Sequence, residues 1–184
     1  GTTDVAVISL SGVVCSKNIK IAGDVLNADI ANYMKDEFKL LIGERTSENV
    51  KIAIGSAIEG EPMEAEVRGR DLVTGLPRQV IVTDSDIREA IMPSILALVD
   101  GIKEVLETTP PELLSDIINR GLILSGGGAL IRGFDTLLRN SLKIPVFVAE
   151  DPLTAVARGA GIILDDFDSY KDVLLNTDDA QVPR

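Results

Sequence analysis

The first 42 residues show two kinds of hydrophobic pattern. Residues 4–10 and 13–21 are short, apolar runs rich in β-branched side chains on either side of a Ser-Gly turn, and they predict a β-hairpin. From residue 25 to residue 41, apolar side chains recur every three or four positions, which is typical of a helix with one buried face. Asp24 can cap the start of this helix and Gly43 can end it.

The next part of the chain departs from this order. Residues 46–57 predict a short helix capped by Thr46 or Ser47. Residues 63–83 alternate around a Thr-Gly-Leu-Pro turn, which indicates two strands. Because these strands interrupt the rhythm of the chain, we interpret residues 43–100 as an inserted subdomain.

The remaining helices and strands follow a regular α/β order. Residues 84–107 have a strong helical period, in which Pro93 predicts a kink or a break into two helices. A short helix is expected up to Arg120. A strand, three glycines, a helix, a strand and a final helix follow, at 121–125, 126–128, 131–141, 144–149 and from residue 151. This order is typical of a sheet with helical crossovers.

Composition narrows the classes of function. Apolar residues make up 45% of the 184 residues but aromatic residues only 3%, so the core must be aliphatic. A net charge of -11 argues against binding to a nucleic-acid backbone and against a polybasic membrane patch. Backbone N–H groups can still hold the phosphates of a nucleotide. No apolar run reaches the roughly 18 residues that span a membrane.

Cysteine and histidine usage excludes further chemistry. With Cys15 alone and no histidine, the chain cannot form an internal disulfide, a plausible zinc site or a Ser-His-Asp triad. We interpret Cys15 as a buried apolar side chain and expect a reducing cytoplasm. The chain begins at Gly1 without a methionine or a signal peptide, from which we expect a fragment of a longer protein.

Three segments are candidates for ligand contact. The glycine turn at 126–129 lets the backbone approach a flat or anionic ligand, although a tight strand-to-helix turn needs glycine anyway. Residues 1–3 offer hydroxyl and N–H groups to phosphate oxygens. Glu48 and Lys51 share one face of a helix and can meet a nucleoside, or form a solvated ion pair.

Matched segments that occur in the right order together resemble the MreB family of bacterial actins. The runs LILSGGGALIRGFDTLL and IPVFVAEDPLTAVARGAGIIL resemble its adenosine motif and closing strand and helix. GTTDVAVISL resembles the end of its second phosphate motif. IKIAGDVLNADIANYM and IGERTSENVKIAIGSA also match, and the similarity runs in order from residue 1 to about residue 166.

This resemblance implies one α/β lobe of the actin-like ATPase (ribonuclease H-like) fold with an inserted α+β subdomain. The lobe would comprise residues 1–42 and 101–166, followed by an acidic tail at 167–184. ATP with Mg²⁺ is implied as the ligand of the intact protein, bound between two lobes. The implied contacts are Gly1, Thr2 and Thr3 at the phosphates, Glu48 and Lys51 at the ribose and adenine, and Gly126, Gly127, Gly128 and Ala129 around the nucleoside. Thr3 is also the implied catalytic residue, positioning the attacking water.

The family implies filaments under the cytoplasmic membrane that direct cell-wall synthesis and shape. Partners would be further copies of the protein, head to tail through the insert, and membrane-associated cell-shape and cell-wall synthesis proteins. Membrane contact is implied for the other lobe, and no nucleic acid is expected. Because the first phosphate hairpin and other acidic residues of the family are absent, we expect the chain alone to bind ATP weakly at best and not to hydrolyse it.

Other classes of protein share this fold. A sugar or acetate kinase lobe, an Hsp70-type ATPase lobe and a divisome or plasmid-segregation actin are alternatives, as is a generic doubly wound domain that binds a partner protein. Fold does not fix function, so the choice among them depends on the matched segments. The MreB interpretation makes one geometric demand, which is that the two glycine turns converge on one nucleotide at the mouth of a single sheet.

Overall fold

The computed structural model describes residues 1–10 and 12–171, and the predicted hairpin is present at its start. Strands β1 (Thr3–Ser9) and β2 (Gly12–Ile19) pair antiparallel, with a register shift between Val7 and Ile8. Helix α3 (Asp84–Thr108) packs along the hairpin. Gly101 of this helix permits the close approach, because a Cβ there would overlap the side chain of Ile19.

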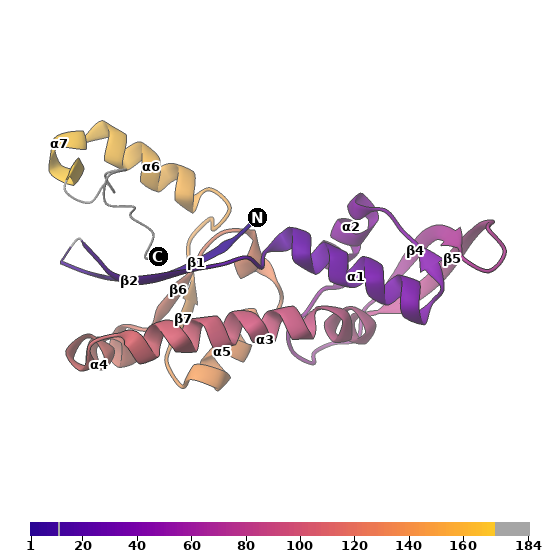
Figure 1. Cartoon of the computed structure of the whole chain (residues 1–184), viewed down its shortest axis with the longest axis horizontal. Coiled ribbons are helices and arrows are strands. Elements are labelled where there is room, and N and C mark those ends of the chain that lie inside the picture. Colours follow the sequence, from indigo (N-terminus) through magenta and orange to yellow (C-terminus); the bar gives the residue numbers. More distant parts are fainter. Residues whose placement is uncertain (11, 172–184) are drawn as a thin grey trace, which may run out of the picture.

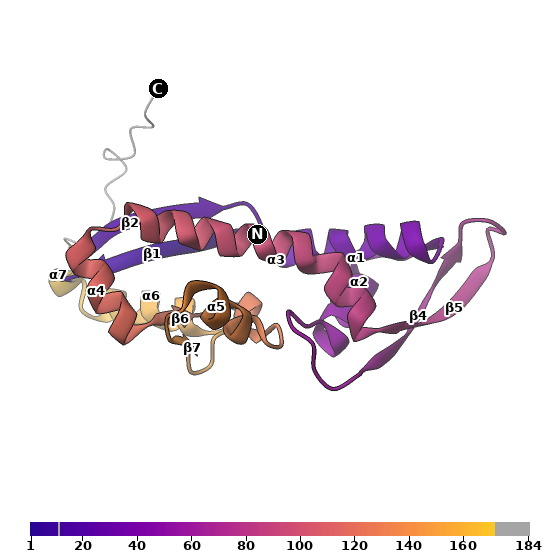
Figure 2. The same cartoon turned by 90° about the horizontal axis from the view of Figure 1, so that it is seen from below.

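Helix α3 is the long central helix of the molecule. It carries a stripe of fully buried isoleucines, Ile87, Ile91 and Ile95, at the spacing that the sequence predicts. Of the two outcomes predicted at Pro93, a kink or a break, the break does not occur, since α3 is a single helix of 25 residues. Figure 2 shows that it bends along its length, as expected where proline removes one backbone hydrogen bond. Packing on both sides of the proline keeps the helix whole.

Helix α1 (Gly23–Glu37) is shorter than the sequence predicts. Lys39 adopts a left-handed conformation, with φ of 51°, and the chain then forms β3 (Leu40–Leu41). Leu40 is completely buried by pairing with the next strand, and this tertiary contact overrides the helical period. The predicted cap is also wrong, because Ala22 occupies the N-cap position and Asp24 lies in the first turn.

The predicted insert contains α2 (Glu44–Ile54), β4 (Glu64–Asp71) and β5 (Pro77–Thr83). The strands form an antiparallel sheet in the order β3-β4-β5, as the alternation indicates. The predicted side-chain cap of α2 is wrong: Gly43 is the N-cap, and the Ser47 hydroxyl donates back to the Gly43 carbonyl. The proposed boundary after residue 100 falls inside α3, so insert and lobe share one helix.

The last third forms the expected strands and helices with shorter bounds. It comprises α4 (Pro111–Arg120), β6 (Leu122–Leu124), the 3₁₀ helix η1 (Gly127–Leu130), α5 (Phe134–Leu142), β7 (Val146–Val148), α6 (Ala155–Asp165) and α7 (Phe167–Tyr170). Strands β6 and β7 are parallel, as expected for a helical crossover. The helix expected at 131–141 begins later, as α5, and η1 precedes it within the glycine turn. Helix α7 begins the predicted acidic tail, and residues 172–184 lie outside the described residues.

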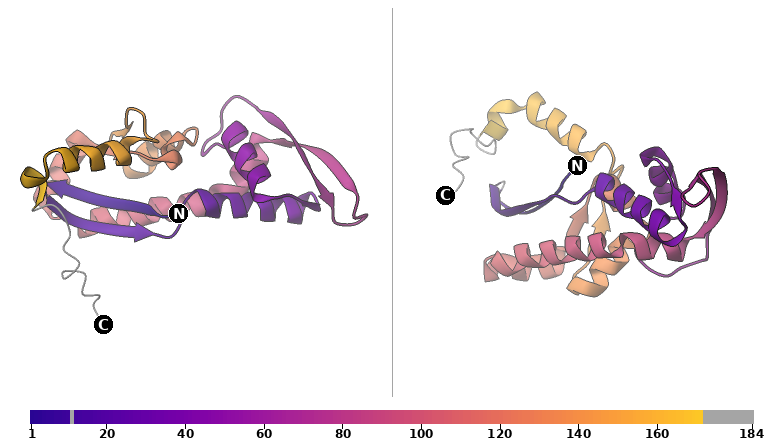
Figure 3. Two further views of the ribbon diagram at one scale, coloured as in Figure 1. Left: turned by 90° about the horizontal axis from the view of Figure 1, so that it is seen from above. Right: turned by 45° about the vertical axis from the view of Figure 1, so that its right-hand side comes forward.

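The single sheet expected from the sequence is not formed. Within residues 1–10 and 12–171, β1–β2 and β6–β7 are separate two-stranded sheets, and no strand pairing joins them. Helices α3 and α6 lie on opposite sides of the β1–β2 hairpin (Figures 1 and 3). The core instead runs through α1, α3 and the insert, with Val146 and α5 residues such as Leu138 joining it from the last third.

Candidate nucleotide site

The start of β1 is fixed through the side chain of Thr3. Its hydroxyl donates a hydrogen bond of 2.7 Å to the carbonyl of Ile21, just before α1. Gly1 and Thr2 are exposed, and the Thr2 hydroxyl donates to Asp4 at 3.4 Å. The single hydroxyl proton of Thr3 is therefore used within the chain, while its oxygen lone pairs stay available to accept.

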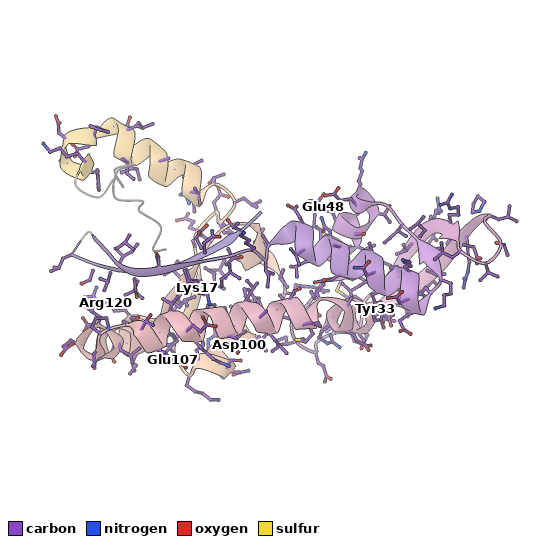
Figure 4. The ribbon with its side chains drawn as sticks, viewed as in Figure 1. Lys17, Tyr33, Glu48, Asp100, Glu107 and Arg120 are labelled. Carbon is purple, nitrogen blue, oxygen red and sulfur yellow. The ribbon has the colours of Figure 1, made fainter. Side chains whose placement is uncertain are left out.

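The two predicted contacts on α2 have different surroundings. Glu48 is exposed and lies on the side of α2 away from β5 (Figure 4). Lys51 is half-buried, and its ammonium donates to Gly23 O at 3.1 Å and to Asn27 Oδ1 at 2.7 Å. Burial lowers the pKa of Lys51, an effect that the nearby carboxylates of Glu48 and Asp24 oppose. Lys51 therefore faces α1, whereas Glu48 faces solvent.

The triple-glycine turn presents its backbone outward. Gly126 has a φ of 79°, in a region that glycine adopts without strain, and its N–H donates to the Pro152 carbonyl at 2.8 Å. Gly127 and Gly128 are exposed, and a Cβ built on Gly128 would meet no atom within 4 Å. Ala129 is buried and anchors the turn. A flat or anionic ligand can thus approach the backbone of this turn closely.

Arg132, which the sequence analysis did not single out, connects this turn to α2. Its carbonyl accepts a hydrogen bond of 2.8 Å from the N–H of Ala57, and its Nε donates to Gly55 O at 3.3 Å. Residues 55–57 directly follow α2. No sequence signal marks an arginine that joins two segments through both its carbonyl and its side chain.

The predicted residues therefore belong to one connected part of the molecule. Thr3 is tied to the start of α1, α1 to Lys51 of α2, and the end of α2 to the residues after η1. The amino terminus and the segment between β6 and α5 both lie near the middle of the long axis (Figures 1 and 2). The start of β1 and the glycine turn at 126–129 are thus linked through α1 and α2, and not through a common sheet.

A separate groove lies on the face of α2 that is opposite to Glu48 and Lys51. Its volume is about 370 Å³, and Thr46, Val50, Ala53 and Arg68 line it. None of the predicted site residues is among its lining residues. By helical geometry Thr46, Val50 and Ala53 point away from Glu48 and Lys51, so this groove is distinct from the candidate site.

Comparison with known proteins settles the family. The model of the family described as MreB/Mbl protein matches residues 1–172. The chain belongs to the MreB/Mbl family. It is 52% identical over 169 residues to the cell shape-determining protein Mbl of Bacillus cereus, covering 91% of the chain and 51% of that protein. It is 48% identical over 171 residues to the cell shape-determining protein MreB of Escherichia coli K12, covering 92% of the chain and 49% of that protein.

Solved structures agree with this MreB/Mbl assignment. MreB5 of Spiroplasma citri bound to ADP superposes with a TM-score of 0.89 at 36% identity, over 94% of the chain and 53% of MreB5. The fold is therefore a lobe of the actin-like fold, as the sequence predicts. The chain spans about half the length of the relatives that it matches.

In residues 1–10 and 12–171, no helix combines the length and the apolar character that crossing a bilayer requires. The same residues contain no group of three or more acidic, cysteine or histidine side chains arranged to hold a metal ion.

Proposed function

We propose that this MreB/Mbl chain is one lobe of an ATP-binding bacterial actin. The polymer would form membrane-associated filaments that control cell shape and direct cell-wall synthesis in the cytoplasm, with other copies and cell-wall synthesis proteins as partners. The observation that carries the nucleotide part is the exposed backbone of Gly127 and Gly128, in a turn that Arg132 links to the residues after α2. The chain is also similar to MreB5 of Spiroplasma citri, which was solved with ADP and with AMPPNP. The proposed role in cell shape is supported by the Mbl and MreB relatives, which are named cell shape-determining proteins.

The described residues suit different parts of ATP. Backbone N–H groups of Gly1, Thr2 and Thr3 suit the phosphates, and the exposed carboxylate of Glu48 can accept from ribose hydroxyls. The glycine turn with Ala129 offers a flat backbone surface to the nucleoside. Mg²⁺ would compensate the phosphate charge, and we assign none of its ligands to this chain.

Thr3 is proposed as the residue that positions the attacking water. Because its hydroxyl proton is donated to Ile21 O, the oxygen can only accept, so it would accept a hydrogen bond from the water and orient it. It would not remove a proton. Such positioning is the usual protein contribution to phosphoryl transfer.

The experiment uses a full-length protein in which this chain follows a first lobe of the MreB/Mbl family. Sedimentation with ATP and Mg²⁺ is expected to pellet polymer, with less pellet in ADP and least without nucleotide. Glu48→Gln should weaken binding of a fluorescent ATP analogue, whereas Glu44→Gln on the same helix should not. Absence of nucleotide binding and of polymer in a protein folded by circular dichroism would reject the proposal.

The kinase and Hsp70 alternatives are not favoured, because the matching family is MreB/Mbl and the relatives from Bacillus cereus and Escherichia coli are named cell shape-determining proteins. Whether the intact protein hydrolyses ATP is part of the same proposal. ATP hydrolysis by the intact protein is tested by measuring the release of phosphate during polymerisation.

A further inference from the structure

Arg88 of α3 makes a buried polar contact with the segment that follows α2. Its Nη1 donates to Ser56 Oγ and to the carbonyl of Ile58, each at 3.2 Å, and to Asp84 Oδ2 at 2.9 Å. Nη1 carries two protons, so the three acceptors share them. The side chains of Arg88 and Asp84 are only 15% and 9% exposed, so removing either charge would leave the other buried without its partner. Arg88 therefore fixes residues 56–58 against α3.

The same segment is held on its other side by Arg132, which follows the glycine turn. Arg132 Nε donates to Gly55 O at 3.3 Å, and its carbonyl accepts from the N–H of Ala57 at 2.8 Å. The contacts of the two arginines thus alternate along residues 55–58, as expected for an extended segment that lies between two neighbours. The glycine turn is therefore connected to α3 through Arg132, residues 55–58 and Arg88.

Asp84 holds the far end of the same loop. Its Oδ1 accepts from the N–H of Met63 at 3.1 Å, and its own N–H donates to the Met63 carbonyl at 2.9 Å. Met63 directly precedes β4. The loop between α2 and β4 is thus tied at both ends to the start of α3 by one ion pair, between Asp84 and Arg88. Neither residue is among the contacts proposed for the nucleotide.

We propose that Arg88 is a positioning residue that sets the place of the glycine turn, and thereby the fit of the nucleoside, without touching the nucleotide itself. This inference rests on the proposed nucleotide site and adds a residue to it. Loss of the guanidinium would free residues 56–58, and Arg132 would move with them because both of its bonds go to this segment. The proposed phosphate contacts at residues 1–3 are tied to Ile21 instead, so they should remain.

The first measurement needs no nucleotide. Backbone hydrogen exchange is followed by mass spectrometry in the full-length protein that carries this chain and in its Arg88→Met variant. Residues 55–58 and 126–133 should exchange about tenfold faster in the variant, because the segment loses its charged donor and opens locally more often. Residues of the β1–β2 hairpin should exchange as in the parent.

The second measurement is affinity for a fluorescent ATP analogue. Arg88→Met should lose about tenfold in affinity, whereas inorganic tripolyphosphate, which has no nucleoside, should bind parent and variant alike. Arg88→Lys keeps a positive charge beside Asp84 and should recover part of the affinity. Ser56→Ala removes one of the acceptors of Arg88 and should lose about threefold. If Arg88→Met does not fold, Arg88→Lys and Ser56→Ala carry both measurements.

Two controls separate positioning from a general loss of stability. Val67→Ala changes a β4 side chain that is only 1% exposed, so it destabilises the insert from within its sheet. Arg139→Met removes another arginine that pairs with a carboxylate four residues away, Asp135 of α5. Both control variants should keep the affinity of the parent for the ATP analogue under conditions in which they are folded.

Different failures point to different conclusions. Unchanged exchange of both segments in folded Arg88→Met would show that Arg88 does not hold them, and the inference is rejected. If exchange rises but affinity for the ATP analogue stays at the parent value, the nucleotide site stands and the positioning role falls. An equal loss for tripolyphosphate, or the same loss in Val67→Ala, also rejects it. A folded parent that binds no nucleotide rejects the proposed function, and the positioning role with it.

Discussion

The backbone N–H of Ala57 donates a 2.8 Å hydrogen bond to the carbonyl of Arg132, and this bond joins the insert to the last third of the chain. A second bond, from Arg132 Nε to Gly55 O, lies beside it. Because Gly55 and Ala57 follow α2 and Arg132 follows η1, the glycine turn cannot move away from α2 while both bonds are made. The geometry of the candidate site therefore depends on this junction.

The first prediction concerns Gly133, next to Arg132. Its φ is 72°, and a Cβ at this position would overlap the side chain of Ile58. Gly133→Ala should therefore destabilise the protein by about 2–4 kcal/mol, from backbone strain and overpacking together. Urea unfolding measures the change.

Shortening Ile58 tests the cause of this destabilisation. The same Gly133→Ala change should be less harmful in an Ile58→Ala background, since only the backbone strain then remains. Equal destabilisation in both backgrounds would show that the clash with Ile58 plays no part.

The second prediction separates folding from binding within the glycine turn. Gly126→Ala places a side chain at a φ of 79° and should reduce stability by about 1–3 kcal/mol. Gly128→Ala meets no atom within 4 Å, so stability should change little, yet the new methyl group would stand where the nucleoside is proposed to lie. Thermal unfolding and nucleotide titration of both variants check this, and unchanged affinity in Gly128→Ala would argue against this part of the site.

The third prediction concerns acid stability at the start of α3. Asp84 accepts from the N–H of Met63 at 3.1 Å and from Arg88 at 2.9 Å. The backbone bond from Met63, followed by the bond from Arg88, holds the pKa of Asp84 below its ordinary 3.8. A lowered pKa in the folded state means that this stabilisation is complete above pH 3.8 and is lost as the pH falls through the lower, folded-state value.

Asp84→Asn is the variant that tests this assignment. It should lower stability at neutral pH and flatten the acid-side slope of unfolding free energy against pH. Asp100→Asn, at an exposed carboxylate of the same helix, is the matched control. A variant with an unchanged acid slope would remove Asp84 as the cause.

Local patterns predicted most of the helices and strands but not how they meet. The hairpin of β1 and β2 and the buried face of α3 follow from short-range alternation and helical spacing, and both are confirmed. The end of α1 could not be predicted, because Leu40 leaves the helical pattern only to pair with β4, far along the chain. The separate sheets were missed for the same reason, since pairing between strands is a tertiary choice.

The candidate site shows the same division. Resemblance predicts ligand contact at the glycine turn, where Gly126 adopts a φ of 79°, and that contact stays a prediction. It also predicts that Lys51 meets a nucleoside, which stays a prediction; in the structure the ammonium of Lys51 donates to Gly23 and Asn27. A lysine with an exposed role and a lysine that ties two helices have the same spacing in sequence, so only the contacts distinguish them.

The last prediction concerns alkaline stability at Tyr33 of α1 (Figure 4). Burial, together with the hydrogen bond that its hydroxyl donates to Glu89 at 3.1 Å, raises the pKa of Tyr33 from 10 to about 12. Because the folded protein holds this proton more tightly than the unfolded chain does, the stabilisation is complete below pH 10 and is lost as the pH rises toward 12. The phenolate absorbance of Tyr33 should therefore appear late in an alkaline titration.

Tyr33→Phe removes the titrating group and keeps the ring, whose centroid lies 6.3 Å from that of Phe38. The variant should lose the late phenolate signal, and its unfolding free energy should fall less steeply between pH 10 and 12. Tyr170→Phe, which changes the second of the two tyrosines, is the control for the absorbance. If Tyr33→Phe leaves the late signal in place and Tyr170→Phe removes it, the assignment to Tyr33 is wrong, and the polar contact between α1 and α3 does not hold that proton.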